Sequence, residues 1–179
     1  MVNYGSDIGS VHIVHDGVTL VPILDAADIA RRYRETFADL RVRSGFTPLV
    51  YDPPETASTW NAEHMAIIAP NGDDVGFVRL SHNRAHRSAS VGIVVLPRFQ
   101  RRGYATRAYQ ALFRYAFEWL GLHRLTAVVY GYNEPSIALH ERLMTREGCD
   151  REAIYWRGEY HDLVTYGILA REYLHGPRS

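Results

Sequence analysis

The sequence predicts a single α/β domain built on a twisted, mixed but mostly antiparallel sheet of six to seven strands, flanked by about four helices. Short turns join β-rich runs in pairs near both ends of the chain, which indicates antiparallel hairpins. A strand, a helix and another strand follow one another between residues 88 and 130, which indicates a parallel crossover in the middle of the sheet. With 179 residues, of which 46% are hydrophobic, the chain suits one core of ordinary size.

The first hairpin follows a polar lead-in, residues 1–10. Asp16-Gly17 separates the β-rich runs Val11–His15 and Val18–Val21, and Asp-Gly at this spacing favours a two-residue turn. The sequence therefore places the start of the domain at residue 11.

A helix is expected next. Asp25 can cap its N-terminus, and apolar residues recur every four positions after it, at Ile29, Tyr33 and Phe37. A second short helix is expected around Leu40.

Two further strands follow a long irregular segment. Residues 44–59 are interrupted by glycine and proline, and a loop of this length predicts a binding lip. The runs Met65–Ile68 and Val75–Leu80 flank the turn Pro70–Asp73, so they are expected to pair as antiparallel neighbours.

The middle of the chain carries the crossover. Ser88–Leu96 is apolar on both faces from Val91 onward, as in a central strand, and Gly92 within it suggests a bulge or a close backbone approach. A helix should begin after Gly103 and end at Gly121. Its apolar face comprises Ala105, Ala108, Leu112, Ala116 and Trp119.

From residue 124 onward, the chain is expected to form a strand, a helix and a pair of strands. Arg124–Tyr130 predicts a buried strand, and Asn133 and Pro135 suit the cap and first turn of a helix that runs to about Met144. A terminal hairpin should follow, with strands at 153–156 and 163–169 around residues 157–160. The domain is expected to span residues 11–174 and to leave a tail at 175–179.

Charge and cysteine content exclude several classes of protein. Twenty arginines, with no lysine, balance twenty acidic residues, which argues against a nucleic-acid or membrane-surface partner. The one cysteine, Cys149, cannot form an internal disulfide, and residues 1–10 carry no leader pattern. No segment approaches the roughly 20 apolar residues of a membrane span. We therefore expect a cytoplasmic protein.

The turn between the central strand and its helix predicts an anion site. A helix N-terminus leaves backbone N–H groups without partners and carries the positive end of the helix dipole. The amides from Arg101 to Ala105 can therefore converge on an anionic oxygen, and the side chains of Arg101 and Arg102 add positive charge.

These residues carry a family resemblance. Gln100–Ala105 matches the signature Q/R-x-x-G-x-G/A and lies between a strand and a helix, as that signature requires. The similarity continues through Asn133–His140 and Gly158–Asp162, and it covers roughly residues 62–173. On this pattern the chain resembles the GNAT acetyltransferases, and most closely the branch with spermidine and ribosomal-protein N-terminal acetyltransferases.

The resemblance implies acetyl-CoA, or another acyl-CoA, as the acyl donor and no metal. The donor would lie between two splayed strands, with its pantetheine arm along Val94, Val95 and Leu96, at an edge opened by the bulge. Asn133 and Ser136 fall where the family contacts the reactive end, although Asn133 could equally be a plain helix cap. The pyrophosphate would bind the loop formed by Arg101, Arg102, Gly103, Tyr104, Ala105 and Thr106.

The expected catalytic acid is unusual here. Relatives commonly place a tyrosine seven residues after the asparagine, and this chain has His140. An imidazolium can protonate the leaving thiolate more readily than a phenol can, because its pKa is about 6.5 instead of about 10. The alternative is that His140 only lines the sheet. The helix also lacks the glycine that usually follows it, since the chain reads Leu143-Met144-Thr145.

The base is missing from its usual place. Ser90 occupies the position where relatives often carry a glutamate, and a serine cannot abstract a proton unaided. His82, His86 and Glu63 are candidates by expected nearness. His82 and His86 lack a third ligand, so a metal pair is not expected.

We expect an N-acetyltransferase that acts on a primary amine of a small metabolite by direct attack. The alternatives are acetylation of a protein N-terminus and a non-catalytic acetyl-CoA-binding module. Residues 25–45 carry arginines and acids in near balance, which weighs against a polyamine. The arginines would instead favour an acceptor with a carboxylate or phosphate, and the aromatic residues Phe46, Tyr51 and Trp60 could hold a ring. Apolar strands near the N-terminus are compatible with a homodimer.

Overall fold

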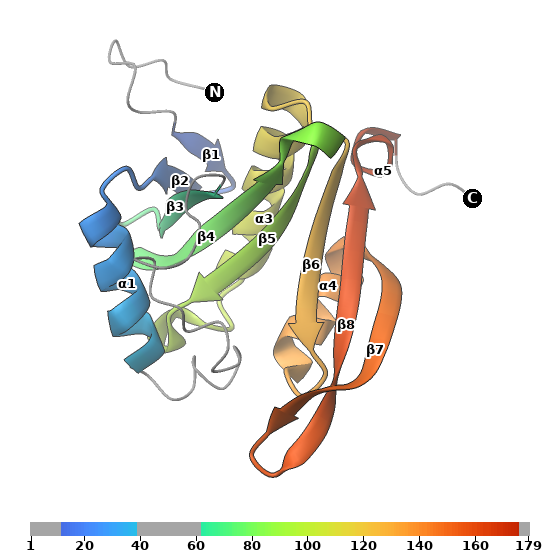
Figure 1. Cartoon of the computed structure of the whole chain (residues 1–179). Coiled ribbons are helices and arrows are strands. Elements are labelled where there is room, and N and C mark those ends of the chain that lie inside the picture. Colours follow the sequence, from blue (N-terminus) through green and yellow to red (C-terminus); the bar gives the residue numbers. More distant parts are fainter. Residues whose placement is uncertain (1–11, 39–61, 176–179) are drawn as a thin grey trace.

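One sheet organises the computed structural model, which describes residues 12–38 and 62–175 (Figure 1). Within these ranges eight strands are ordered β1-β2-β3-β4-β5-β6-β8-β7, and only β5 and β6 pair in parallel. The count exceeds the expected six to seven because both strands of each terminal hairpin join the same sheet. The strands are β1 (Ile13–His15), β2 (Val18–Pro22), β3 (Ala62–Ile68), β4 (Asp74–Asn83), β5 (Ser88–Val95), β6 (Arg124–Tyr130), β7 (Thr145–Trp156) and β8 (Glu159–Leu169).

Both expected hairpins are confirmed, although the strands of the terminal one are longer than expected and begin at Thr145 and Glu159. Asp16 and Gly17 have φ values of 43° and 75° between β1 and β2, and Arg157 and Gly158 have values of 52° and 90° between β7 and β8. Two successive residues with positive φ form the turn whose twist matches that of the flanking strands. Local turn residues thus set the register next to each turn, and farther along β7 and β8 the register shifts twice.

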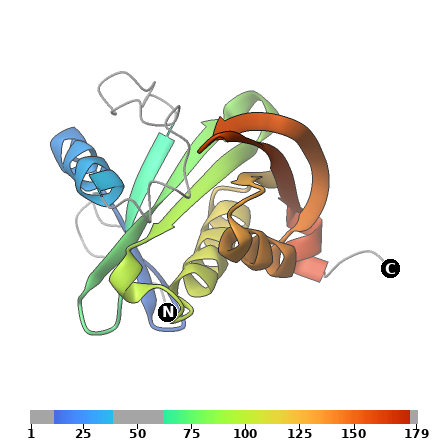
Figure 2. The same cartoon turned by 90° about the horizontal axis from the view of Figure 1, so that it is seen from below.

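The helices cover the two faces of the sheet unequally. α3 (Tyr104–Arg114) and α4 (Glu134–Leu143) lie on one face, and α1 (Ala26–Ala38) lies on the other (Figure 2). The main core packs Val78 and its neighbours against Leu112 of α3, whereas Phe37 of α1 packs on Phe77 and Val94 in a smaller cluster. The short helix α5 (Ala170–His175), which the sequence reasoning did not predict, follows β8.

The expected bulge at Gly92 is wrong. Gly92 pairs regularly with Arg79, and a Cβ at Gly92 would meet nothing within 4 Å. The close approach occurs at Gly76 in β4, where a Cβ would lie 2.0 Å from Val94 O. Only glycine fits there, because any side chain would collide with the backbone of β5.

The crossover helix is confirmed, and its end differs from a regular α-helix. Residues 115–119 form a π-helical turn, and Gly121 closes the helix with a φ of 60°. The apolar face is broader than expected, because Tyr109, Phe113 and Phe117 are also buried. The single turns η3 (Arg84–His86) and η4 (Pro97–Phe99) flank β5.

Asn133 caps α4, as expected, and accepts a hydrogen bond from the Ser136 amide. At the other end α4 leads into β7 without glycine: Met144 N donates to His140 O at 2.8 Å, and β7 begins at Thr145. The expectations for residues 1–10, for the helix near Leu40, for the lip at 44–59 with its aromatic residues and for the end of the tail lie outside the described residues.

Candidate active site

A gap opens between the two parallel strands. β5 and β6 pair at only three positions, from Ser88–Arg124 to Ser90–Thr126, although β5 continues to Val95 and β6 to Tyr130. The strands therefore diverge toward their C-terminal ends (Figure 1). Such a gap leaves backbone groups of a central sheet without a neighbouring strand, and an extended ligand can pair with them.

Main-chain groups of Val95 face this gap. Leu96 N donates to Val75 O at 2.9 Å, and Val94 O lies against Gly76, so the main-chain groups of these two residues point to β4. Because backbone groups alternate along a strand, those of Val95 point the other way. One of them, Val95 O, accepts a hydrogen bond from Gln100 Nε2 at 2.9 Å, which ties the strand end to the following loop.

The loop before α3 presents backbone amides. Arg101 and Gly103 adopt left-handed φ values of 59° and 78°, and Gly103 caps α3 without a side-chain hydrogen bond. The first-turn amides of Tyr104, Ala105 and Thr106 therefore have no side-chain cap from Gly103. Alternating backbone conformations at a helix N-terminus form a concave nest of N–H groups that suits an anion.

Arginines surround the same loop. Arg107 Nη2 donates to Arg102 O at 2.9 Å and its guanidinium lies over the Tyr104 ring, 4.9 Å from the centroid. Arg102 lies 5.9 Å from the centroid of Phe99. Among the described residues neither Arg101 nor Arg102 forms an ion pair, so their charge is available to an anionic ligand.

The N-terminus of α4 joins three predicted site residues. Asn133 Oδ1 accepts from Ser136 N at 3.3 Å, and Ser136 Oγ lies 3.3 Å from His140 Nδ1. The cap role of Asn133 is thus confirmed, and contact of Asn133 and Ser136 with a cofactor stays a prediction.

His140 is buried, with both ring nitrogens engaged. Its side chain is 3% exposed, Nδ1 lies 2.7 Å from Ser136 O, and Nε2 lies 2.7 Å from the Tyr109 hydroxyl. Because a carbonyl oxygen only accepts, Nδ1 carries the proton, and in the neutral ring the Tyr109 hydroxyl donates to Nε2. Burial lowers the pKa of His140. The side chain of His140 lines the sheet, which was the alternative to a catalytic role. The role of His140 as catalytic acid stays a prediction.

The base candidates come together on the α3 side of the sheet. His82 Nε2 lies 2.9 Å from Glu63 Oε1 without good hydrogen-bond alignment, and the Tyr115 hydroxyl donates to Glu63 Oε2 at 2.9 Å. Burial and the neighbouring carboxylate raise the pKa of Tyr115. No hydrogen bond or ion pair joins this trio to His140 within the described ranges, and His86 lies exposed in η3.

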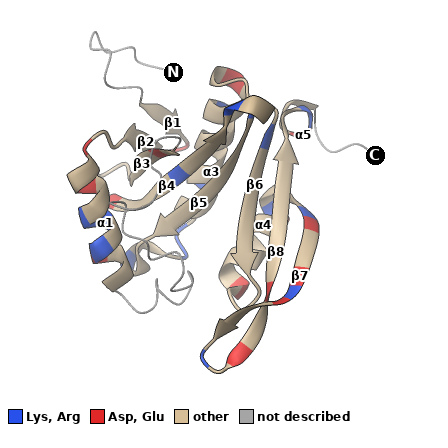
Figure 3. Ribbon diagram, in the orientation of Figure 1, with Lys and Arg blue, Asp and Glu red and all other residues tan. Residues whose placement is uncertain are grey.

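On the opposite side of the sheet, the described helices leave one part uncovered, which we call the open face and define by Ser90, Gly92 and Val128. Ser90 is exposed, and Val128 is 59% exposed. Charged residues gather on α1 and on the β7–β8 hairpin, while the middle strands are nearly free of them (Figure 3).

Sequence reasoning missed two residues beside the open face. His64 of β3 and Arg79 of β4 are directly paired neighbours on the α1 side. His64 is 6% exposed, its Nε2 lies 3.2 Å from the Tyr33 hydroxyl, and burial together with the charge of Arg79 lowers its pKa to about 4. Arg79 could have been noticed as the one charge in the apolar run Val75–Leu80.

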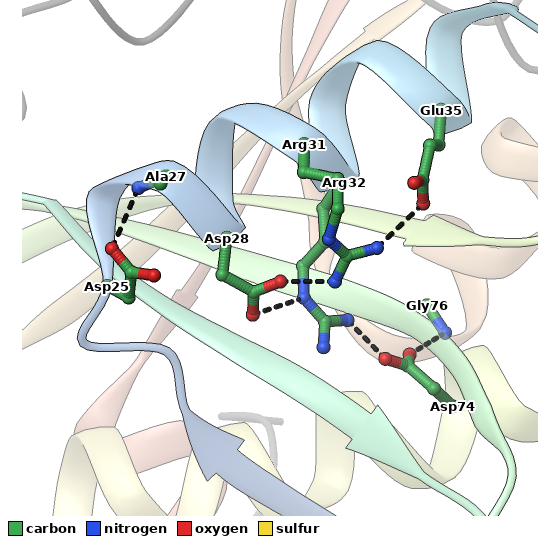
Figure 4. Close-up of polar contacts among 8 residues, drawn as sticks. All are labelled: Asp25, Ala27, Asp28, Arg31, Arg32, Glu35, Asp74 and Gly76. Carbon is green, nitrogen blue, oxygen red and sulfur yellow. Dashed lines mark hydrogen bonds and ion pairs between the residues drawn. The ribbon is translucent and has the colours of Figure 1, made fainter.

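The arginines of α1 are bound internally (Figure 4). Arg31 pairs with Asp28 and Glu35, and Arg32 pairs with Asp28 and with Asp74 at the start of β4. The Arg32–Asp74 contact fastens α1 to the sheet, and the contacts within the helix neutralise its acids. Of the arginines that the sequence suggested for an anionic acceptor, Arg31 and Arg32 are therefore already paired with acids, and those at 41 and 43 lie outside the described residues.

The described residues lack two further features. They hold no group of three or more His, Cys, Asp or Glu side chains placed to bind a metal ion. Among them, no helix has both the length and the apolar character needed to cross a membrane.

Known proteins similar to the chain are named as N-acetyltransferases. YdaF of Bacillus subtilis (strain 168), provisionally named a ribosomal N-acetyltransferase, is 37% identical over 106 residues, which are 58% of this chain and 57% of YdaF. Spermidine N(1)-acetyltransferase of Escherichia coli (strain K12) is 30% identical over 115 residues, 63% of this chain and 62% of that protein. The matches thus span about three fifths of these relatives.

Solved structures share the fold over a longer stretch. An acetyltransferase of the GNAT family from Bacillus anthracis has a TM-score of 0.72 at 25% identity and covers 90% of this chain and 99% of its own. A chimera of Vibrio cholerae spermidine N-acetyltransferase SpeG and hSSAT has a TM-score of 0.76 at 22% identity and covers 89% and 99%.

The family model for the acetyltransferase (GNAT) family matches residues 28–144, which is more than half of the chain and includes the gap, the α3 loop and α4. The chain belongs to the GNAT acetyltransferase family.

Proposed function

We propose that this protein transfers the acetyl group of acetyl-CoA to a primary amine of a small molecule by direct attack. The observation that carries the proposal is the gap between β5 and β6, which leads to a helix N-terminus without a side-chain cap and to Arg101 and Arg102, which form no ion pair among the described residues. Val95 would pair with the pantetheine arm, with Val94 and Leu96 flanking it. The amides and side chains from Arg101 to Thr106 would bind the pyrophosphate.

The chemistry divides between two faces. The donor supplies a thioester, whose carbonyl an amide near Val95 can polarise. The helix side of the sheet is filled by α3 and α4, so the amine would approach from the open face. Its nitrogen attacks the carbonyl carbon, the C–S bond breaks and the thiolate takes a proton.

We further propose a path for that proton. In its imidazolium form His140 would give the Nδ1 proton to the Ser136 hydroxyl, 3.3 Å away, and that hydroxyl would pass its own proton to the sulfur, which leaves His140 as a neutral imidazole. Ser90 lacks a carboxylate, and Glu63 and His82 lie on the α3 side. The amine would therefore lose its own proton to water.

Two alternatives remain distinct from this proposal. Acetylation of a protein N-terminus is favoured by the similarity to YdaF, and a non-catalytic acetyl-CoA-binding module is favoured by His140 and Ser90 in place of the usual residues. A polyamine acceptor is disfavoured, because Asp28 and Glu35 of α1 are paired with arginines of the same helix.

Thiol release from acetyl-CoA on a panel of acceptors separates these functions. The panel contains small amines, spermidine and short peptides with free N-termini, and acetyl-CoA binding is measured by calorimetry in parallel. We expect acceptor-dependent release with small amines. Release with peptides alone would support the protein acceptor, and tight binding without release would support the non-catalytic module.

A further inference from the structure

Arg79 is a charged side chain in the middle of the sheet. It lies on β4 between His64 of β3 and Gly92 of β5, its direct neighbours in the two antiparallel ladders. It is half-buried. It forms no hydrogen bond or ion pair with any described residue, in contrast to Arg32 on the same side of the sheet.

The described groups around Arg79 do not compensate its charge. His64 is neutral near pH 7, because burial and Arg79 lower its pKa to about 4, and burial keeps the Tyr33 hydroxyl protonated by raising its pKa. The acids of α1 and of the start of β4 are paired with Arg31 and Arg32. A guanidinium cannot shed its proton, so a half-buried one needs an anionic partner.

There is room for that partner on the open face. A Cβ added at Gly92 would have no atom within 4 Å, and the next residue on this side of β5 is the small, exposed Ser90. Ser81 of β4, opposite Ser90, is small as well. Across the gap, Val128 of β6 is 59% exposed. A ligand can therefore reach Arg79 from the face where β5 and β6 begin to diverge.

We propose that Arg79 binds an anionic oxygen group, a carboxylate or a phosphate, of the amine acceptor. This inference rests on the proposed function and names the acceptor class: an amine that carries an anion a few bonds away. The guanidinium would hold the anion beside Gly92 by paired hydrogen bonds and so direct the amine toward the gap.

Matched acceptors test this assignment. An amino acid is compared with the amine left by removing its carboxylate, and an aminoalkyl phosphate with the corresponding amino alcohol. We expect Arg79→Gln to lower kcat/KM about 10- to 100-fold for the anionic member of each pair, and less than about threefold for the neutral member. The two pairs distinguish carboxylate from phosphate. Arg171→Gln, at an exposed site on α5, is the matched control and should change neither.

Two outcomes overturn the proposal: wild-type preference for the neutral members, or an equal loss on both members in Arg79→Gln. Acetyl-CoA affinity should stay unchanged in this variant. If wild type binds acetyl-CoA but acetylates nothing, the proposed function fails. Calorimetry then measures the binding of an N-acetyl amino acid and of inorganic phosphate to wild type and to Arg79→Gln, which tests the anion site independently of turnover. Binding that Arg79→Gln abolishes supports the anion site, and no binding, or equal binding, refutes it.

Discussion

Arginines on one side of the sheet occupy two contrasting environments. Arg31 and Arg32 of α1 are surrounded by acids at helical spacing and by Asp74, so their charges are satisfied within the fold (Figure 4). Within residues 12–38 and 62–175, Arg79 has no acidic partner, and neither do Arg101 and Arg102 of the α3 loop. The contrast separates arginines that fasten elements together from arginines that are available to ligands. Stability should depend on the first group and ligand binding on the second.

Charge reversal at the α3 loop should have the largest effect. Replacing Arg101 and Arg102 with Glu sets negative charges beside the amides that would bind the pyrophosphate. We expect acetyl-CoA affinity to fall about 100-fold or more, with a weaker dependence on salt than in wild type, because favourable charge contacts are lost. Calorimetry at two salt concentrations measures both. Arg171→Glu serves as the control, and unaltered affinity in the double variant would refute the loop assignment.

Acidification tests the environment of Arg79. His64 has a pKa of about 4 in the folded chain against about 6.5 when unfolded. The unfolded chain therefore binds more protons between these values, so stability is lost as pH falls from about 6.5 toward 4. The loss from this residue should be about 3 kcal/mol at most. Urea unfolding at several pH values measures it, and a His64→Gln variant should show a shallower decline. Equal slopes in both proteins would contradict the burial of a neutral His64.

Removal of the expected acid should lower turnover. We predict that His140→Phe reduces kcat about 10- to 50-fold and leaves acetyl-CoA affinity within about twofold. Burial lowers the pKa of His140, so an acid role makes kcat fall as pH rises through a value below the ordinary 6.5 or so. Ser136→Ala should share the loss in kcat if its hydroxyl carries the proton. Unchanged turnover in His140→Phe would remove the residue from the acid role and leave it as a packing residue against Tyr109.

Substitution of a paired arginine should have the smallest effect, and it should change folding stability instead of ligand binding. Arg32→Gln removes contacts with Asp28 and Asp74, and partly buried ion pairs of this kind contribute about 1 kcal/mol. We expect that loss in the free energy of urea unfolding, with acetyl-CoA affinity unaltered. Arg79→Gln should leave the same free energy unchanged or slightly raise it. A larger loss of stability in Arg79→Gln than in Arg32→Gln would contradict the claim that Arg32, and not Arg79, stabilises the fold.

Local signals explain what could be predicted from the sequence. Asp16-Gly17 and Asn133 act through their own backbone and nearest neighbours, so a turn and a cap can be inferred without a fold. The loop from Gln100 to Ala105 is equally local. Its site could therefore be located before the sheet was known.

Contacts between distant segments explain what was missed. Whether Gly76 or Gly92 meets a neighbouring backbone depends on strand pairing, which the run of residues does not encode. The burial of His140 depends on Tyr109, 31 positions earlier. Arg32 suits an anionic acceptor on sequence alone because one of its partners, Asp74, belongs to a different element.

Backbone amide hydrogen exchange with and without acetyl-CoA tests most directly whether the gap and the α3 loop form the donor site. The account predicts slower exchange at Val95 and at the amides from Arg101 to Thr106 when acetyl-CoA is bound, with no change on α1. Unaltered exchange at these amides in the presence of bound acetyl-CoA would contradict it.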